Sequence, residues 1–205
     1  SNPPGTVYQA EISTDSGFSV LTASQQTSAS AIDFAGLTAI TTYYVQVKAI
    51  NVNGISSAYT SLSSTETLAA PPGVLPYANV AADQLQANWT FNGNPAGTTY
   101  LAILSSGASP STNGWSGNVS SATSNLFARY SSLEANHDYI VEVRAIPPDG
   151  PPSLFASMGS TWTLANPPVN GILRAVYGSS ITATWGENGN PMWTDYRLEA
   201  SLESG

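Results

Sequence analysis

The stretch from residue 139 to 145, Tyr-Ile-Val-Glu-Val-Arg-Ala, alternates apolar and polar side chains. The same alternation occurs 96 residues earlier, where residues 43–49 read Tyr-Tyr-Val-Gln-Val-Lys-Ala. A period of two with one apolar face is typical of half-buried antiparallel strands. A turn pair follows each stretch, Asn53-Gly54 or Asp149-Gly150, and supplies the positive φ that a tight hairpin needs. We therefore expect both stretches to be strands of a repeated β unit.

The repeat extends over most of the chain. Residues 67–72, Thr-Leu-Ala-Ala-Pro-Pro, recur as 163–168, Thr-Leu-Ala-Asn-Pro-Pro, again 96 residues later. Asn-Pro pairs begin at residues 2, 94 and 190, each followed by a tyrosine six residues after the asparagine. The first of these intervals is 92 residues, so the second copy carries four extra residues, around 105–117. This many markers in one register indicate a tandem repeat.

A second alternating stretch occurs in the middle and last copies. Leu85, Ala87 and Trp89 fall on one face of residues 84–89, and the equivalent residues 181, 183 and 185 repeat the pattern. No window shows a sustained 3.6-residue apolar stripe, so the sequence predicts an all-β protein. The predicted core positions that recur between copies are Trp89, Trp185, Tyr43, Tyr139, Leu37 and Leu133.

These residues resemble the fibronectin type III domain. The resemblance rests on the Pro-rich start at Pro71-Pro72, on Trp89, on Tyr100, and on Leu133 six residues before Tyr139. The last spacing matches a tyrosine corner, in which a tyrosine hydroxyl bonds back to the backbone at the sandwich edge. The resemblance implies a seven-stranded sandwich of about 100 residues. The expected architecture is a tandem of immunoglobulin-like sandwiches joined by short Pro-Pro linkers, which favour extended, stiff backbone.

On this register the chain contains one complete copy and two partial ones. Residues 70–165 form the complete domain, 1–69 are a copy lacking its first two strands, and 166–205 hold the first three strands of another. A half sandwich leaves its core and a strand edge uncovered. Either these residues are part of a longer tandem array, or the partial copies complete each other between molecules. In the second case, residues 166–190 fill the gap beside 1–69, and one third strand is redundant.

Composition excludes several classes of function. Five Lys and Arg against 13 Asp and Glu cannot neutralise a nucleic-acid backbone, so no nucleic-acid partner is expected. With no cysteine and one histidine, neither a zinc nor an iron–sulfur site is expected, and no cofactor is implied. No stretch approaches the roughly 20 apolar residues that a membrane helix needs. We expect a folded, acidic protein with no membrane span in this segment.

The candidate catalytic residues do not form a repeated set. His137 is a single histidine in a turn, next to the strand of Tyr139. Glu11 and Glu199 are equivalent, but the middle copy has Ile103 at that position. Glycoside hydrolysis needs paired carboxylates at a defined separation. We therefore predict that these glutamates lie on solvated strand faces and that the protein is not an enzyme.

Three tryptophans outside the predicted core are candidates for interaction with a partner. Trp115 lies within the four-residue insertion, Trp162 ends the last strand of the complete copy, and Trp193 begins the third strand of the last copy. An exposed tryptophan in a polar setting stacks on a sugar or anchors a protein interface. The alternative is that these rings cover a sheet edge or contact a neighbouring domain.

The sequence thus predicts a non-catalytic structural or adhesive repeat, located outside the cell or on its surface. Low charge, the absence of cysteine and abundant Ser, Thr, Ala and Asn resemble bacterial extracellular repeat proteins. Its expected partners are neighbouring copies of the repeat, within one chain or head to tail between chains, and surface glycans or other surface proteins. The alternative is an accessory module, spacer or carbohydrate-binding, of a secreted polysaccharide-degrading enzyme.

Overall fold

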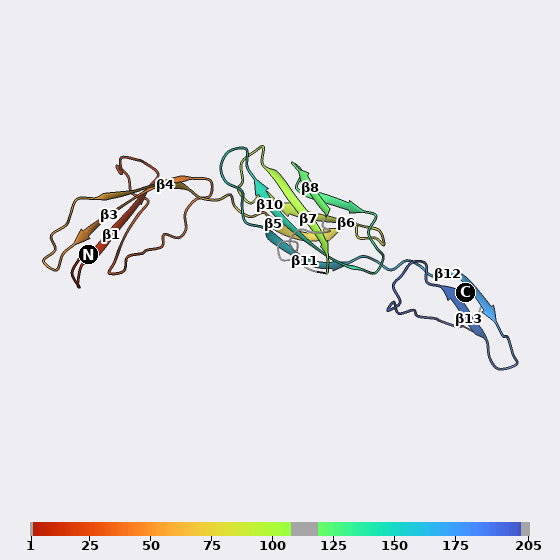
Figure 1. Cartoon of the computed structure of the whole chain (residues 1–205). Helices are drawn as coiled ribbons and strands as arrows, with labels where there is room; N and C mark the ends of the chain where they lie inside the picture. Colours follow the sequence, from red (N-terminus) through yellow and green to blue (C-terminus); the bar gives the residue numbers. More distant parts are fainter. Residues whose placement is uncertain (1, 108–118, 202–205) are drawn as a thin grey trace. The chain divides into compact units, whose positions relative to one another are not determined.

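The computed structural model of the chain describes residues 2–107 and 119–201. All regular secondary-structure elements in that part of the chain are β-strands (Figure 1), which confirms the all-β prediction. The strands are β1 (Val7–Ser13), β2 (Ala23–Thr27), β3 (Thr42–Ile50), β4 (Thr60–Glu66), β5 (Gly73–Ala78), β6 (Gln84–Thr90), β7 (Thr99–Ser106), β8 (Val119–Thr123), β9 (Phe127–Ser131), β10 (Asp138–Ile146), β11 (Ala156–Trp162), β12 (Val169–Arg174) and β13 (Thr182–Gly186).

Strands β5 to β11 form a sandwich of two antiparallel layers. One layer has the strand order β5-β6-β9, and the other has the order β11-β10-β7-β8. Alternate residues of β6 and β10 face inward. Five of them are at most 1% exposed: Leu85, Ala87, Trp89, Val141 and Val143. These seven strands in two layers agree with the sandwich that the resemblance to fibronectin type III implies.

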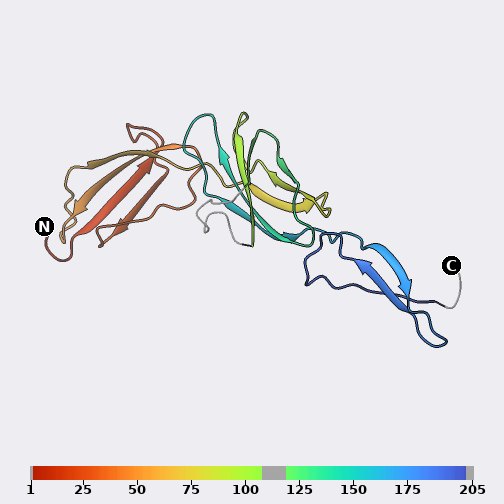
Figure 2. The ribbon, with the colours of Figure 1, turned by 45° about the vertical axis from the view of Figure 1, so that its right-hand side comes forward.

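The first segment, residues 2–69, contributes a single layer. Its strand order is β2-β1-β3-β4, and Figure 2 shows these strands side by side. In the repeat register this layer is equivalent to β8-β7-β10-β11. Residues 31–35 are equivalent to β9 but form no strand. The reason is that β9 pairs with β6, and no strand equivalent to β6 occurs in residues 2–69.

The last segment contributes the two strands of the other layer. Strands β12 and β13 pair as β5 and β6 do. Residues 191–201 follow them without forming a strand, although the equivalent residues form β1 and β7 in the other copies. In those copies the strand pairs with β3 or β10, and the described residues after 166 contain no equivalent of either.

Trp185 and Trp89 differ in exposure within the described residues. Trp89 is 1% exposed, whereas Trp185, at the same position of the repeat, is 38% exposed. Each ring contacts the equivalent tyrosine, with centroids 5.8 Å apart for Trp89 and Tyr100 and 5.7 Å for Trp185 and Tyr196. The layer that buries Trp89 has no equivalent among the described residues around Trp185, so the core position of Trp185 stays a prediction.

The chain divides into two compact units, which we describe separately. Unit 1 comprises residues 1–71, 92–99 and 144–154, and unit 2 comprises residues 72–91, 100–143 and 155–205. Two loop regions of the predicted middle copy, 92–99 and 144–154, therefore cluster with the first segment. The copy boundaries at 69/70 and 165/166 remain predictions from the repeat.

Tyr77 on β5 joins the two layers of the sandwich within unit 2. Its hydroxyl donates a hydrogen bond to the carbonyl oxygen of Gly159 (2.8 Å) and accepts one from the backbone N–H of Val141 (3.1 Å). Burial raises the pKa of Tyr77 to about 12, although the hydrogen bond from Val141 acts in the opposite direction. The hydroxyl must therefore stay protonated to hold both strands.

This arrangement predicts a loss of stability at alkaline pH. An unfolded tyrosine ionises near pH 10, and the pKa of Tyr77 in the folded protein is about 12. Its contribution to the free energy of unfolding is therefore complete below pH 10 and is lost as the pH rises through about 12. Denaturant unfolding between pH 8 and 11 should show a shallower decline in Tyr77→Phe than in the wild type.

The matched control is Tyr177→Phe, because Tyr177 is 70% exposed. This variant should follow the wild-type pH dependence. A Tyr77→Phe variant whose stability declines as steeply as that of the wild type would show that the Tyr77 hydroxyl does not link the layers.

Candidate functional site: the junctions between copies

The residues predicted from the sequence occupy different environments. Tyr43 and Tyr139 are 2% and 6% exposed, while Leu37 and Leu133 are half-buried. Trp162 and Trp193 are 53% and 62% exposed, on different segments of the repeat. Trp115 lies outside the described residues. The exposed tryptophans thus offer surface rings and contribute little to the core.

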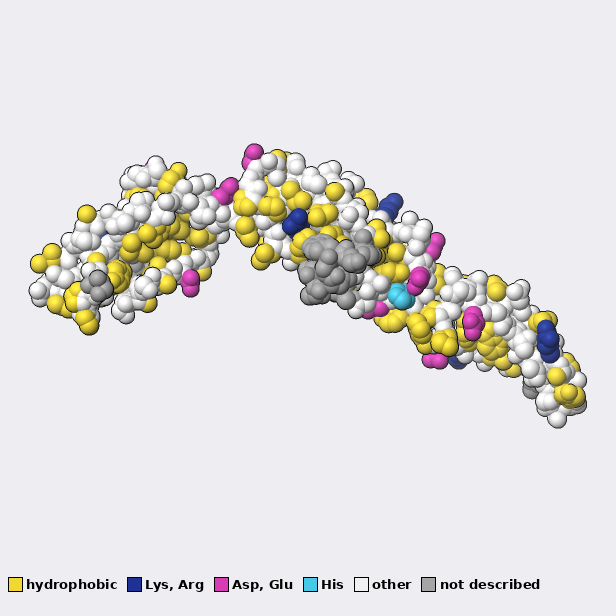
Figure 3. Space-filling view, in the orientation of Figure 1, with side chains coloured by type: hydrophobic (Ala, Val, Ile, Leu, Met, Phe, Trp, Pro, Cys, Tyr) yellow, Lys and Arg dark blue, Asp and Glu magenta, His cyan; other side chains and the backbone are white. Residues whose placement is uncertain are grey.

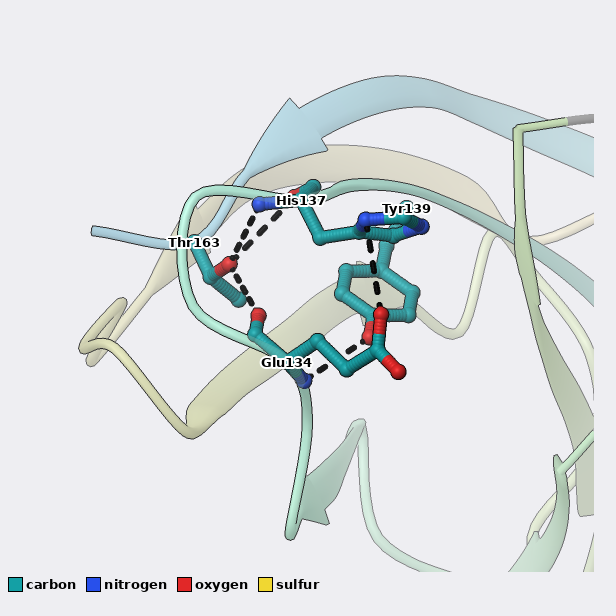
Figure 4. A network of polar contacts seen from close by, with 4 residues as sticks. All are labelled: Glu134, His137, Tyr139 and Thr163. Atoms are coloured by element: carbon teal, nitrogen blue, oxygen red, sulfur yellow. Dashed lines mark hydrogen bonds and ion pairs between the residues drawn. The ribbon is translucent and has the colours of Figure 1, made fainter. Parts of the chain in front are cut away.

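Both tyrosine corners are present. The Tyr139 hydroxyl accepts a hydrogen bond from the backbone N–H of Glu134, 3.0 Å away (Figure 4). In the first segment, the Tyr43 hydroxyl accepts the equivalent bond from Thr38 at 3.0 Å. The spacing of leucine and tyrosine therefore predicted a real feature of the fold.

Glu11 is buried, which corrects the prediction of a solvated face. It is 7% exposed, and its carboxylate accepts hydrogen bonds from Gln9 (2.9 Å), Gln46 (2.9 Å) and the Tyr59 hydroxyl (2.5 Å). Burial acts to raise the pKa of Glu11, but the bonds from Tyr59 and the two amides and the charge of Lys48 leave the pKa lowered. The group is held ionised by neutral donors and a cation, which suits a structural role.

The prediction of a solvated face is confirmed for Glu199, whereas Glu142 is buried like Glu11. Glu142 is 4% exposed and is also not solvated. The Glu199 side chain, in contrast, is 72% exposed and pairs with Arg197 at 2.7 Å. The described residues contain no group of three or more His, Asp or Glu side chains that could hold a metal ion. Among the same residues, no helix is long and apolar enough to cross a membrane.

His137 belongs to the turn that ends at the tyrosine corner. Its ring lies 5.4 Å from that of Tyr139, and its Nδ1 atom is 3.6 Å from the Glu134 carboxylate (Figure 4). Its backbone N–H donates to the Thr163 hydroxyl at 3.0 Å. Thr41 makes the same backbone bond in the first segment, to Thr67 at 3.1 Å. The turn therefore needs the backbone at this position and does not depend on an imidazole.

Thr163 fastens the end of the last strand to this turn. Its hydroxyl donates to the carbonyl oxygen of Glu134 (2.6 Å), and its backbone N–H donates to that of His137 (3.0 Å). Thr67 makes the same two bonds at the first tyrosine corner, at 2.6 and 3.0 Å. Each linker thus begins at a threonine that is fixed to the preceding copy.

An asparagine fixes the other end of each linker. The Asn94 side chain accepts a hydrogen bond from the backbone N–H of Ala70 (3.2 Å) and donates one to its carbonyl oxygen (2.8 Å). Asn190 holds Asn166 in the same way, at 2.7 and 2.8 Å. Asn94 and Asn190 are 6% and 5% exposed. We call these two pairs the asparagine clasps.

A second asparagine in each of these copies binds the proline that follows the clasped residue. The side-chain amide of Asn92 donates to the carbonyl oxygen of Pro71 at 2.7 Å. Asn188 donates to Pro167 at 2.9 Å. The pairs Asn92/Asn188 and Asn94/Asn190 therefore recur with the Pro-Pro sequence that they hold.

The remaining residues of the first linker are also bonded within unit 1. The carbonyl oxygen of Leu68 accepts a hydrogen bond from Ile40 (3.3 Å), and the N–H of Ala69 donates to Pro151 (3.1 Å). Each residue from 67 to 71 therefore has at least one backbone group in a hydrogen bond. The first linker is therefore bonded from residue 67 to residue 71.

Gly150 lies where the middle copy's turn meets the first linker region. Its φ is +92°, and a Cβ atom there would lie 2.9 Å from both the Ile40 methyl and the Glu66 carboxylate. Gly54, at the same position of the repeat, has φ +79° and no atom within 4 Å of such a Cβ. Both turns need the left-handed conformation, but only one turn lacks room for a side chain.

Replacement of these glycines by alanine should therefore have unequal effects. Gly54→Ala carries only the left-handed backbone cost of about 1 kcal/mol. Gly150→Ala adds a steric clash at the junction, which raises the loss to about 2–3 kcal/mol. Thermal unfolding of the two variants compares them directly. Equal losses would mean that the Gly150 turn has no close contact with residues 40 and 66.

The comparisons with known proteins gave matches among solved structures. No protein-family model and no curated protein sequence matches the chain. Two matching structures come from chicken: the FN1–FN3 domains of CNTN1 (16% identity, 78% of this chain, 56% of that chain, TM-score 0.36) and a segment of two fibronectin type III domains of tenascin (18%, 77%, 84%, TM-score 0.40). A redesigned β-sandwich protein also matches (18%, 46%, 90%, TM-score 0.38). The chain spans little more than half of the CNTN1 fragment.

The strand layers and tyrosine corners define the class of protein. The chain is an all-β tandem of fibronectin type III-like sandwiches, with one copy closed and two copies open in the described residues. Sequence reasoning used the Asn-Pro pairs only as register markers and missed the role of the asparagines. The available signal was that these asparagines recur at the same offset as the Pro-Pro linkers.

Proposed function

We propose that the chain is a non-catalytic structural module that holds consecutive sandwiches in a fixed relation to one another. It serves as a building unit of a rod or filament in a secreted or surface protein. The observation that supports this proposal is the repeated bonding of the linkers, with a threonine on one side and an asparagine clasp on the other.

Hydrogen bonds along a linker restrict the motion of the sandwiches that it joins. Domains joined by a free linker move relative to each other unless an interface holds them. Here the residues between the two anchors, 68 and 69, are themselves bonded. Each such hydrogen bond contributes about 1 kcal/mol, and Pro-Pro restricts the backbone that follows. Several small contributions along five residues oppose bending at the junction.

Adhesion is the second part of the proposal. Trp162 and Trp193 present large aromatic surfaces at 53% and 62% exposure. Aromatic rings of this kind bind sugars by stacking or anchor protein interfaces. Surface glycans and surface proteins are the partners that suit them. Rigid spacing and exposed rings together fit a module that displays binding surfaces away from its point of attachment.

Amide hydrogen exchange tests the structural part of this function. The backbone N–H groups of Thr67, Ala69 and Ala70 should exchange at least about tenfold more slowly than those of an unbonded loop. Asn94→Ala should accelerate exchange at the Ala70 amide. The Thr67 amide should stay protected, because it donates to the carbonyl oxygen of Thr41 in the first segment. Exchange at all three amides as fast as in an unstructured peptide would contradict the proposed function.

A further inference from the structure

The β5-β6-β9 layer of the middle sandwich carries a groove of about 390 Å³ that contains one arginine. The residues that line it include Asn79, Gln84, Gln86, Arg129 and Ser131, and we call it the polar groove. We propose that the polar groove binds a uronic acid, the carboxylate-bearing sugar of an acidic glycan. This inference rests on the adhesive part of the proposed function and names the class of ligand.

The strand register brings the polar side chains of the groove to one face of the layer. On β6 and β9, Gln84 pairs with Ser131 and Gln86 pairs with Arg129. Leu85, between the two glutamines, is 1% exposed and faces the core. Because side chains alternate along a strand, the four polar residues share the outer face. The groove is therefore built on paired strands and not on a loop.

The Arg129 side chain is held in place by its neighbours. Its Nε atom donates a hydrogen bond to the side-chain oxygen of Gln86 (2.9 Å), and its guanidinium carbon lies 5.2 Å from the centroid of the Phe127 ring. Asn79 donates to the same Gln86 oxygen at 3.0 Å, and the Gln86 amide donates to Asn88 at 2.7 Å. The guanidinium is thus oriented before a ligand arrives, which reduces the entropy cost of binding.

The Arg129 charge has no counter-charge nearby. Among the described residues, no carboxylate forms an ion pair with Arg129, and none of those that line the groove is Asp or Glu. This is unusual for a chain with 13 acidic residues and five basic ones. A guanidinium group whose Nε is already bonded still presents its two terminal nitrogens, and such a planar fork binds a carboxylate at two points.

The neutral residues beside Arg129 favour a sugar as the carrier of that carboxylate. Gln84 and Ser131 are exposed, and an amide and a hydroxyl group both donate and accept hydrogen bonds. Figure 3 shows Lys and Arg side chains that lie singly on the face in view and do not gather into a patch. A heavily sulfated or phosphorylated polymer needs several cations. One cation among neutral donors and acceptors suits a ring with one carboxylate and several hydroxyl groups.

The polar groove is not part of the repeated scaffold. The residue equivalent to Arg129 in the first copy is Asp33, and the residue equivalent to Gln86 in the last copy is Thr182. The core position Trp89, on the same strand as Gln86, recurs as a tryptophan. The fold thus keeps its core residues from copy to copy and does not need the groove residues, so their arrangement in the middle copy suits a ligand.

The test is an NMR titration of the 205-residue chain with trigalacturonic acid and, in parallel, with its methyl ester, which has no charge. The acid should shift the signals of the Arg129 Nε–H and the Gln86 amide, and it should bind at least about tenfold more tightly than the ester. Arg129→Gln should bind the two sugars equally weakly. Arg174→Gln is the control, because it removes the same charge at an exposed position outside the groove.

A triglutamate peptide tests the class of ligand, because it carries carboxylates without sugar hydroxyl groups. It should bind at least about tenfold more weakly than trigalacturonic acid, and equal affinity would overturn the inference. Equal affinity of the wild type for the acid and the ester, or no shift with any of the three probes, would overturn it as well.

The proposed function can survive the failure of this inference. Sugar binding that is lost in Trp162→Ala and kept in Arg129→Gln would overturn the inference but support adhesion through the exposed rings. Slow exchange of the linker amides would still support the structural function if no sugar bound. The two failures are therefore distinguishable.

Discussion

Trp89→Ala is expected to cost about 3–5 kcal/mol of the free energy of unfolding, the range for large aromatic side chains in a packed core. Trp89 is 1% exposed and contacts Tyr100 between two closed layers. A single domain has a stability of only about 5–15 kcal/mol. The variant should therefore unfold the middle sandwich at a much lower denaturant concentration, as followed by far-ultraviolet circular dichroism.

Trp185→Ala is the matched control, because it is the same substitution at the same position of the repeat. Trp185 is 38% exposed, so the expected loss is about 1 kcal/mol. Similar losses in the two variants would show that the last segment has a closed core after all.

Asn94→Ala is expected to cost about 2 kcal/mol, because it removes both hydrogen bonds to the backbone of Ala70. The N–H and carbonyl groups of Ala70 are half-buried, so water replaces the lost bonds only in part. Asn92→Ala is the control. It removes a single exposed bond to Pro71 and should cost about 0.5–1 kcal/mol.

Denaturant unfolding measures both losses. A tandem fusion of two chains, in which only one chain carries the substitution, isolates its effect on the coupling between neighbouring sandwiches. If Asn92→Ala were as destabilising as Asn94→Ala, the two hydrogen bonds of the clasp would contribute no more to the free energy of unfolding than the single bond of Asn92. If neither variant changed stability, the linker would be held by its prolines alone.

The local patterns predicted much of the fold because they depend on neighbours that are close in sequence. Alternation in residues 139–145 predicted β10, and the spacing of Leu133 and Tyr139 predicted the tyrosine corner. The same patterns cannot show whether a second layer is present. For that reason the alternation that places Trp89 in a core places Trp185 there too, although 38% of Trp185 is exposed.

Glu11 shows a second limit of the pattern. It lies between Ala10 and Ile12 on β1, so alternation puts it on the outer face. That face is covered by Tyr59, whose hydroxyl bonds to the Glu11 carboxylate from 48 residues away. Lys48 lies over the Tyr59 ring, 4.7 Å from its centroid. A contact between residues so far apart produces no periodic pattern in the sequence. The same holds for the hydrogen bonds between Asn94 and Ala70.

We propose that the bonded linker fixes neighbouring copies relative to each other. The chain has no cysteine, so single cysteines at the exposed positions Gln25 and Gln84 allow specific spin labelling on either side of the first junction. We predict a narrow distribution of label-to-label distances by pulsed electron paramagnetic resonance, which broadens in Asn94→Ala. A broad distribution in the wild type, unchanged by Asn94→Ala, would contradict the claim.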